Sequence, residues 1–237
     1  AVVDACANDF IALATAAFES AASVSVRNEP RSCAWQVISC YYAAYFAANA
    51  LMRLAGYVCT NFDADVCTAI NENASLCGSG GVTPKEKISP GVHFCTFKQG
   101  KIPELLVQSM DGVKGGVHIQ FWAGFIRFLD AIEKELAAGP LTSVDKKAAK
   151  SELNDLREVL TRTNRPNGSW LSEVRNAVNY RLEKGVWFPY MNSDVGGDDL
   201  KSLLRNGVQG LTWLHSAGEM VPDCSRLVSA SSVLLRW

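Results

Sequence analysis

The segment from Thr161 to Arg181 carries the residue types best suited to binding a phosphate. Its ionisable side chains are four basic ones and one acidic one: Arg162, Arg165, Arg175, Arg181 and Glu173. This local excess of positive charge occurs in a chain of 237 residues whose net charge is only −1. A guanidinium presents a planar fork of N–H donors that matches two phosphate oxygens at once. The segment therefore predicts a local anion site, and nucleic acid bound there would be released by salt.

Four polar side chains recur at helical spacing around Arg175. Side chains three or four residues apart lie on the same side of an α-helix, so Arg175 shares a face with Asn179, and Asn176 shares the adjacent face with Tyr180. One arc of the helix then presents a guanidinium, two carboxamides and a phenol. Two interpretations stay open. The cluster is a ligand site, or Arg175 pairs with a buried carboxylate while Asn176 and Tyr180 bond to each other.

Other signatures of catalysis are missing from the sequence. It contains no P-loop, no dinucleotide-binding fingerprint, no His-Glu-x-x-His motif and no Gly-x-Ser-x-Gly elbow. The three histidines, His93, His118 and His215, lie far apart along the chain, and each is expected to be a packed or surface residue rather than a catalyst. We therefore expect neither a metal nor a cofactor.

The cysteine pattern predicts reduced thiols and a cytoplasmic location. The eight cysteines include no Cys-x-x-Cys pair and do not form the dense framework of a small secreted protein. The first 22 residues contain acidic but no basic side chains, so no signal peptide is expected. A zinc site is the alternative, although it lacks the usual paired ligand spacing; its ligands would come from Cys59, Cys67, Cys77, Cys95 and His93.

The elements that must position the basic segment are helices, because apolar residues recur at helical spacing over most of the chain. Gly56 is expected to end the second helix in a left-handed conformation, and Ser169 to cap the helix that carries Arg175. The expected helices cover residues 4–23, 30–56, 117–138, 143–162, 170–184, 199–221 and 223–237.

Residues 32–52 contain no charged side chain and are long enough to cross a bilayer as a helix. Polar residues, three tyrosines and many weakly apolar alanines lie within this run. A buried central helix is therefore expected, with a membrane span as the alternative.

Residues 57–116 show no clear period and form the least regular third of the chain. Short helices are expected at 62–76 and 103–110, and residues 92–98 would form a strand without a partner. The sequence thus predicts an all-α fold: a single domain over residues 1–237, a bundle of about seven to nine helices, with a long irregular insertion at about 57–116.

Two segments resemble the HEPN superfamily, helical bundles of prokaryotic toxin–antitoxin and antiviral defence systems. Residues 35–56, WQVISCYYAAYFAANALMRLAG, are similar to the early aromatic and alanine-rich helix of that family. Residues 175–180, RNAVNY, are similar to its motif, in which an Arg, often followed by Asn, precedes a His by a few residues. In this chain Tyr180 stands at the position of the His.

The resemblance implies a metal-independent endoribonuclease that acts as a homodimer, as a toxin or phage-defence effector. Arg175 would stabilise the phosphate, Tyr180 would replace the proton-transferring His, and Asn176 would orient both. A phenol, with an ordinary pKa near 10, is a poor base at neutral pH unless cations lower that pKa. RNA or a nucleotide would be the ligand, a cognate antitoxin or defence-system protein the partner, and the remaining phosphate contacts would come from Arg181, Arg165, Asn179 and Arg162.

Two other functions stay open. A HEPN-like bundle that has lost catalysis would bind RNA, a nucleotide or a partner protein. A helical interaction protein would use its arginines only for structure. Residues 187–190, Trp-Phe-Pro-Tyr, are expected to form a contact for self-association or a lid if these aromatic side chains are exposed, and a turn that plugs the core is the alternative.

Overall fold

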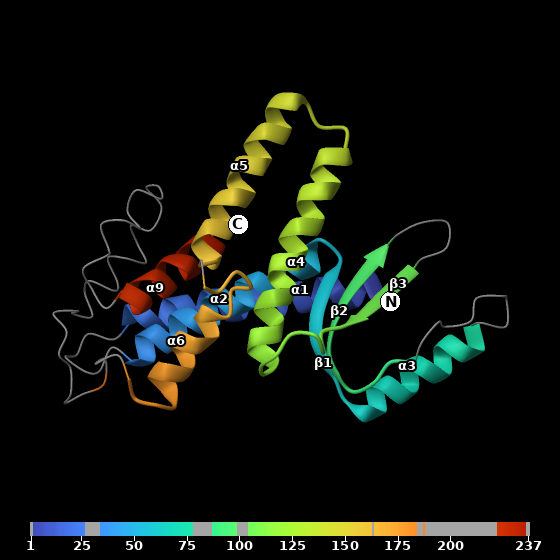
Figure 1. Cartoon of the computed structure of the whole chain (residues 1–237), viewed down its shortest axis with the longest axis horizontal. Coiled ribbons are helices and arrows are strands. Elements are labelled where there is room, and N and C mark those ends of the chain that lie inside the picture. The colour runs from blue at the N-terminus through green and yellow to red at the C-terminus, as the bar shows by residue number, and fades with distance from the viewer. Residues whose placement is uncertain are drawn as a thin grey trace.

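The computed structural model describes residues 2–26, 34–77, 87–98, 104–162, 164–183, 187 and 222–235. Within them the chain forms seven α-helices and one three-stranded sheet (Figure 1). Their order is α1 (Val2–Val26), α2 (Ala34–Leu54), β1 (Tyr57–Phe62), α3 (Ala64–Cys77), β2 (Gly91–Lys98), β3 (Glu104–Ser109), α4 (Val117–Ala138), α5 (Ser143–Leu160), α6 (Trp170–Asn179) and α9 (Pro222–Leu234).

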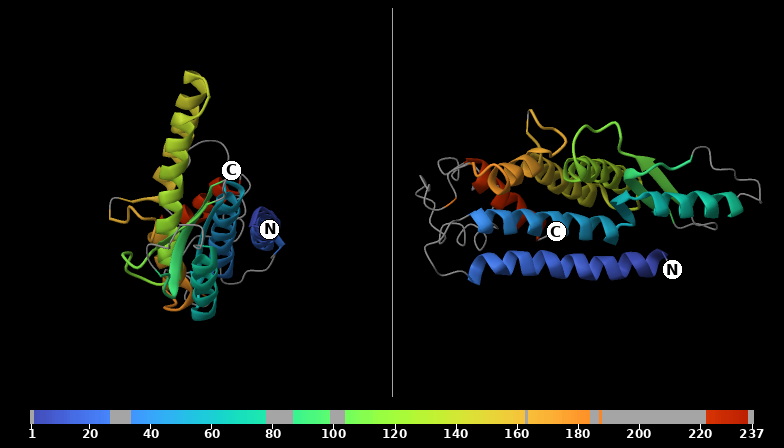
Figure 2. Two further views of the ribbon diagram at one scale, coloured as in Figure 1. Left: turned by 90° about the vertical axis from the view of Figure 1, so that its right-hand side faces the viewer. Right: turned by 90° about the horizontal axis from the view of Figure 1, so that it is seen from below.

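Helix α2 is the centre of the helical part of the molecule. It contacts α1, α4, α6 and α9, and α1 runs beside it over most of its length (Figure 2). Its uncharged run is explained by burial, because side chains such as Val37, Tyr41 and Met52 are enclosed by the neighbouring helices. The alanines between them let those helices approach closely. A search of the described residues for a helix long and apolar enough to span a membrane finds none.

Helices α4 and α5 form an antiparallel pair that extends away from α2 (Figure 1). Thr142 caps α5 by accepting a hydrogen bond from the backbone N–H of Asp145. Arg157 of α5 forms ion pairs with Asp130 and Glu133 of α4, at 3.0 and 2.8 Å. Toward its C-terminal end α5 buries apolar side chains in the core. This packing fixes the point at which the chain leaves the helix.

The sheet corrects the prediction of an all-α fold. Its strand order is β1-β2-β3, and both pairs are antiparallel. Residues 92–98 are the central strand, not a strand without a partner, and residues 103–110, predicted as a helix, contain β3. Val92 and Phe94 of β2 belong to the main core, whereas β3 pairs with β2 on one side only. The fold is therefore mostly helical with one small sheet.

Most expected helices are confirmed, with shifted ends. Gly56 ends α2 with a φ of 77°, and α3 matches the short helix expected at 62–76. Helix α6 ends at Asn179, well before residue 184, because Tyr180 is its C-cap and Leu182 has a φ of 54°. The predicted start of α2 at residue 30 and the predicted helix at 199–221 lie outside the described residues.

Candidate functional site

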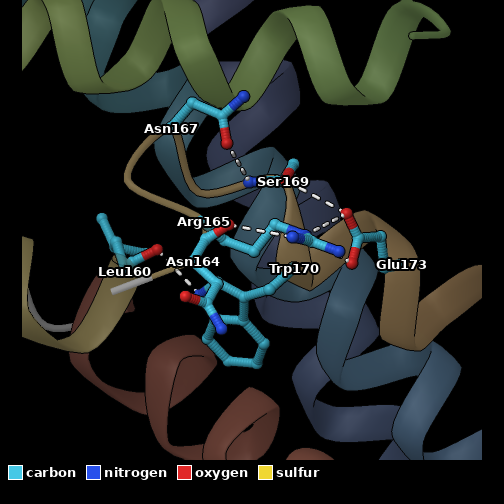
Figure 3. Close-up of polar contacts among 7 residues, drawn as sticks. All are labelled: Leu160, Asn164, Arg165, Asn167, Ser169, Trp170 and Glu173. Atoms are coloured by element: carbon cyan, nitrogen blue, oxygen red, sulfur yellow. Dashed lines mark hydrogen bonds and ion pairs between the residues drawn. The ribbon is translucent and has the colours of Figure 1, made fainter. Parts of the chain in front are cut away.

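The turn between α5 and α6 fixes the position and direction of α6 (Figure 3). The indole N–H of Trp170 donates to the carbonyl oxygen of Leu160 at 2.8 Å, which ties the first residue of α6 to the last of α5. The side chain of Arg165 donates from Nε to both carboxylate oxygens of Glu173, at 2.7 and 2.9 Å. Ser169 is the N-cap residue, as predicted, but its side chain makes no cap hydrogen bond to the backbone.

Arg175 is directed from α6 toward α2, and only 8 % of it is exposed. Its Nη2 donates to the phenol oxygen of Tyr42 at 2.6 Å, and its Nη1 donates to Oδ1 of Asn176 at 2.9 Å. The guanidinium carbon lies 5.8, 5.5 and 5.0 Å from the ring centres of Tyr41, Tyr42 and Tyr180. Burial alone lowers the pKa of Arg175, but the bond to Tyr42 and the surrounding phenols raise it overall, so the charge is retained.

No carboxylate neutralises Arg175 within the part of the chain that the structure describes. Glu173, the acidic residue closest to it in sequence, pairs with Arg165 instead. The interpretation in which Arg175 pairs with a buried carboxylate is therefore wrong for the described residues. The side chains of Asn176 and Tyr180, both described, do not bond to each other either: Oδ1 of Asn176 accepts from Arg175, and the bond between Asn176 and Tyr180 is a backbone one, from the N–H of Tyr180 to the carbonyl oxygen of Asn176 at 3.0 Å. The Nε of Arg175 is buried and has no hydrogen-bond partner among the described side chains and backbone. A buried cation with neutral partners favours an anionic ligand.

His118, expected from the sequence to be a packed or surface residue, lies in the same cluster. It occupies the first turn of α4, is half-buried, and its Nδ1 is 2.9 Å from the phenol oxygen of Tyr41. Its ring centre is 4.8 Å from that of Tyr45 and 6.3 Å from that of Tyr42. Burial, and then the charge of Arg175, lower the pKa of His118 below its ordinary value of 6.5. The imidazole is therefore neutral at pH 7.

Tyr41 connects His118 to the rest of the cluster. Its oxygen accepts a hydrogen bond from the indole N–H of Trp122 at 3.2 Å and lies 3.3 Å from the hydroxyl of Ser172. Burial is the main reason why the pKa of Tyr41 is raised to about 12, so its phenol keeps its proton. His118 and Trp122 are four residues apart, and this spacing placed both on one helical face in the sequence. The spacing predicts that His118 and Trp122 face the same neighbour, but it does not identify that neighbour as Tyr41.

The other predicted site residues occupy the two ends of α6. Asn179 is half-buried in its last turn, and Tyr180 beyond it is 67 % exposed with its ring beside Arg175. Arg181 pairs with Glu183 at 3.6 Å. At the other end, Arg165 is engaged by Glu173, and the guanidinium of Arg162 lies 4.2 Å from the ring centre of Trp170. The structure thus gathers Arg175, Asn176 and Tyr180 and separates them from Arg162 and Arg165.

Trp187 packs against the core. Its indole N–H donates to the carbonyl oxygen of Val178 at 2.6 Å, and its ring meets that of Trp35 edge-on at 5.7 Å. This favours the core-plugging alternative for Trp187. Residues 188–190, the rest of the predicted contact for self-association, lie outside the described residues.

In the described ranges no group of three or more His, Cys, Asp or Glu side chains is placed to hold a metal ion. The cysteines whose side chains are described, Cys6, Cys40, Cys59, Cys67 and Cys95, are free thiols. Comparison of the chain with protein-family models, with curated proteins and with solved structures finds no match in any of the three. The described groups of the site are a buried guanidinium, a neutral imidazole and a set of phenols.

Proposed function

We propose that the protein is a HEPN-like, metal-independent endoribonuclease that binds the phosphate backbone of RNA at Arg175. The observation that carries this proposal is the burial of the Arg175 guanidinium against neutral partners only, among the described residues. A fixed cation in a largely water-free setting is worth more to a developing negative charge than the same cation in water. Stabilising the negative charge that develops on the phosphate in the transition state is what strand cleavage requires.

The contact between the two HEPN-like segments supports the proposal. Residues 35–56 form most of α2 and residues 175–180 lie in and just after α6, and the hydrogen bond from Arg175 to Tyr42 joins them. Segments that are 133 residues apart at this bond therefore build one site. Homodimerisation, a cytoplasmic location and a role as a toxin or defence effector with a cognate partner belong to the same proposal, on the resemblance alone.

Each residue of the motif has a defined task in this proposal. Arg175 binds the phosphate through the guanidinium, and Tyr42 and Asn176 hold that guanidinium in place. Tyr180, exposed beside Arg175, stacks on an unpaired base and donates a proton to the leaving oxygen. Arg181, Arg165, Asn179 and Arg162 contact the RNA further along its backbone.

A second candidate is a HEPN-like module that binds RNA, a nucleotide or a partner protein without cleaving it. The identity of Tyr180 favours it, because a phenol replaces the imidazole of the family motif. In that case Arg175 and Tyr180 serve recognition through charge and stacking.

The two candidates are separated by cleavage of a labelled, mixed-sequence RNA in excess EDTA. Wild type is compared with Arg175→Ala, Tyr180→Phe and Arg226→Ala, the last being an exposed arginine on α9 and the matched control. We expect wild type and Arg226→Ala to cut, and Arg175→Ala to cut about 10² to 10³-fold more slowly, as when a preorganised donor to a developing charge is removed. Thermal unfolding of each variant verifies that the fold is kept.

Binding measured on the same proteins completes the test. Binding without cleavage, lost in Arg175→Ala and kept in Arg226→Ala, would favour the second candidate. Cleavage by Arg175→Ala at the wild-type rate would remove Arg175 from the mechanism. Neither cleavage nor binding by wild type would contradict both candidates.

A further inference from the structure

His118 supplies the group that the motif helix lacks, a side chain that exchanges a proton near neutral pH. We propose that His118 is a catalytic residue of the site, the acceptor of the proton from the RNA 2′-hydroxyl, and that Tyr41 is its positioning residue. The inference rests on the proposed function, because it assigns a step to the same site. It places the proton acceptor on α4 instead of α6.

The first support is geometric. His118 and Arg175 lie against the same two phenol rings: the ring centre of Tyr42 is 6.3 Å from that of His118 and 5.5 Å from the guanidinium carbon. Tyr41 contacts both, through the bond of 2.9 Å to Nδ1 of His118 and through its ring, 5.8 Å from the guanidinium carbon. A phosphate held by Arg175 therefore lies within the same cluster as the imidazole.

The second support is the hydrogen bonding of Tyr41. The Tyr41 oxygen accepts from Trp122 and carries one proton of its own. When that proton is donated to Ser172, the same oxygen accepts from Nδ1–H of His118, and the lone pair of Nε2 is available as a base. When it is donated to Nδ1 of His118 instead, Nε2 carries a proton and is an acid. The network thus accommodates both neutral forms of His118, the one protonated at Nδ1 and the one protonated at Nε2. A base that accepts a proton at Nε2 and later releases it passes between such forms.

The third support is the charge of Arg175. It disfavours the protonated imidazole and, after burial, is a cause of the lowered pKa of His118. A bound phosphate neutralises that charge. The imidazole is therefore kept neutral, ready to accept a proton, in the free protein and becomes more basic when the substrate binds.

The step balances without a metal or a redox partner. The proton of the 2′-hydroxyl moves to Nε2 of His118, and the 2′-oxygen forms a bond to the adjacent phosphorus. The bond from phosphorus to the 5′-oxygen breaks, and that oxygen takes the phenol proton of Tyr180. The products are a 2′,3′-cyclic phosphate and a 5′-hydroxyl, after which His118 gives a proton to water and Tyr180 regains one from it.

The test compares wild type, His118→Gln, His118→Ala and Tyr41→Phe, with His93→Gln as the matched control. His93 is buried in the sheet, where its Nδ1 is 2.9 Å from the carbonyl oxygen of Gly91, and it takes no part in the site. Cleavage of RNA in EDTA is measured from pH 5 to 8, and binding is measured with 2′-O-methyl RNA, which offers no 2′-hydroxyl proton.

We expect His118→Gln to cleave about 10² to 10⁴-fold more slowly, the usual contribution of general acid–base catalysis, with binding of 2′-O-methyl RNA unchanged. Free imidazole should restore cleavage by His118→Ala. At RNA concentrations well below saturation, where the rate reports the free protein, the rate of wild type should rise with pH through an apparent pKa below 6.5. His118→Gln should lack this rise, and Tyr41→Phe should shift it. His93→Gln should match wild type.

Cleavage by His118→Gln at the wild-type rate, with Arg175→Ala inactive, would overturn the assignment of His118 and leave the proposed function standing. Equal losses of binding and cleavage in His118→Gln would also overturn it, as a structural effect. An inactive wild type would overturn both proposals.

A second test uses wild type alone, so it does not depend on whether the His118 variants fold: the histidine rings are titrated by NMR. We expect the pKa of His118 to increase when 2′-O-methyl RNA is added, because the phosphate offsets the charge of Arg175. An unchanged pKa with RNA bound would overturn the inference.

Discussion

The helical part of the molecule differs from β3 and α3 in how far it fixes its side chains, whereas β1 and β2 contribute buried residues to the main core. In α2, α4 and α6 the residues of the site are held from several sides: Tyr41, Trp122 and Ser172 are buried and bonded to one another. In the sheet part, β3 has no buried residue and α3 buries only Cys67 among its described side chains. The contrast shows that the candidate chemistry lies where packing determines geometry.

The two parts meet where α4 crosses the sheet. A Cβ placed on Gly124 would lie 2.7 Å from Sγ of Cys59 in β1, so this glycine permits the close approach of helix and strand. Nearby, the phenol of Tyr57 donates to the carboxylate of Glu135 at 2.6 Å. The sheet is thus attached to α4, the helix that carries His118.

Replacing Trp122 should have the largest effect on stability. Trp122→Ala removes a fully buried side chain and the N–H donor to Tyr41, so the free energy of unfolding should fall by about 3 to 5 kcal/mol. Urea unfolding measures the change. A loss below about 1 kcal/mol would mean that the helical part is packed no better than a surface site.

Gly124→Ala tests the junction between the two parts. The new methyl group collides with Cys59, and overpacking of this kind costs about 1 to 3 kcal/mol. In a Cys59→Ala background the collision with Sγ is gone, and the better helix propensity of alanine should make the same change neutral or stabilising. Additive effects of the two substitutions in urea unfolding would contradict the close contact.

Acidification should weaken the helical part through His118. Below pH 6.5 the unfolded chain binds a proton at this residue that the folded chain, with its lowered pKa, does not bind. The free energy of unfolding should therefore fall as the pH drops from about 6.5 to the lowered folded pKa, by at most about 1.4 kcal/mol per pH unit. His118→Gln should lose this component of the pH dependence. An identical pH dependence in His118→Gln would contradict it.

Replacing Leu105 in β3 should have the smallest effect. Leu105 is 52 % exposed, so Leu105→Ser should change the free energy of unfolding by no more than about 0.5 kcal/mol. A change comparable to that of Trp122→Ala would show that β3 is packed as tightly as the helical part, and the contrast between the two parts would disappear.

The same contrast explains what the sequence could predict. Helices α4 and α5 were predicted because each buries one face against neighbours, which gives a helical period. Helix α2 was predicted from its long uncharged run, because it is buried on most sides. Strand β3 was misassigned to a helix because neither of its faces is buried, so no alternation marks it. The structure of β3 depends on its pairing with β2, for example of Gln108 with Phe94. The order of apolar and polar residues within β3 does not indicate which strand it pairs with.

In the candidate site, too, the sequence predicted contacts within one helix but not contacts between distant segments. Arg175, Asn176 and Tyr180 were found because they are neighbours on or next to one helix. His118 was missed because its contact with Tyr41 spans 77 residues, and only the packing of α4 on α2 brings the two together.

The hydrogen bond between Tyr42 and Arg175 has a consequence for biosynthesis. Arg175 follows Tyr42 by 133 residues, so a ribosome that adds about 5 to 20 residues per second reaches it about 7 to 27 s after Tyr42. Helix α2 emerges well before α6 can complete the site. An unfinished chain therefore lacks Arg175, so under the proposed function RNA binds at the site only after synthesis has passed α6.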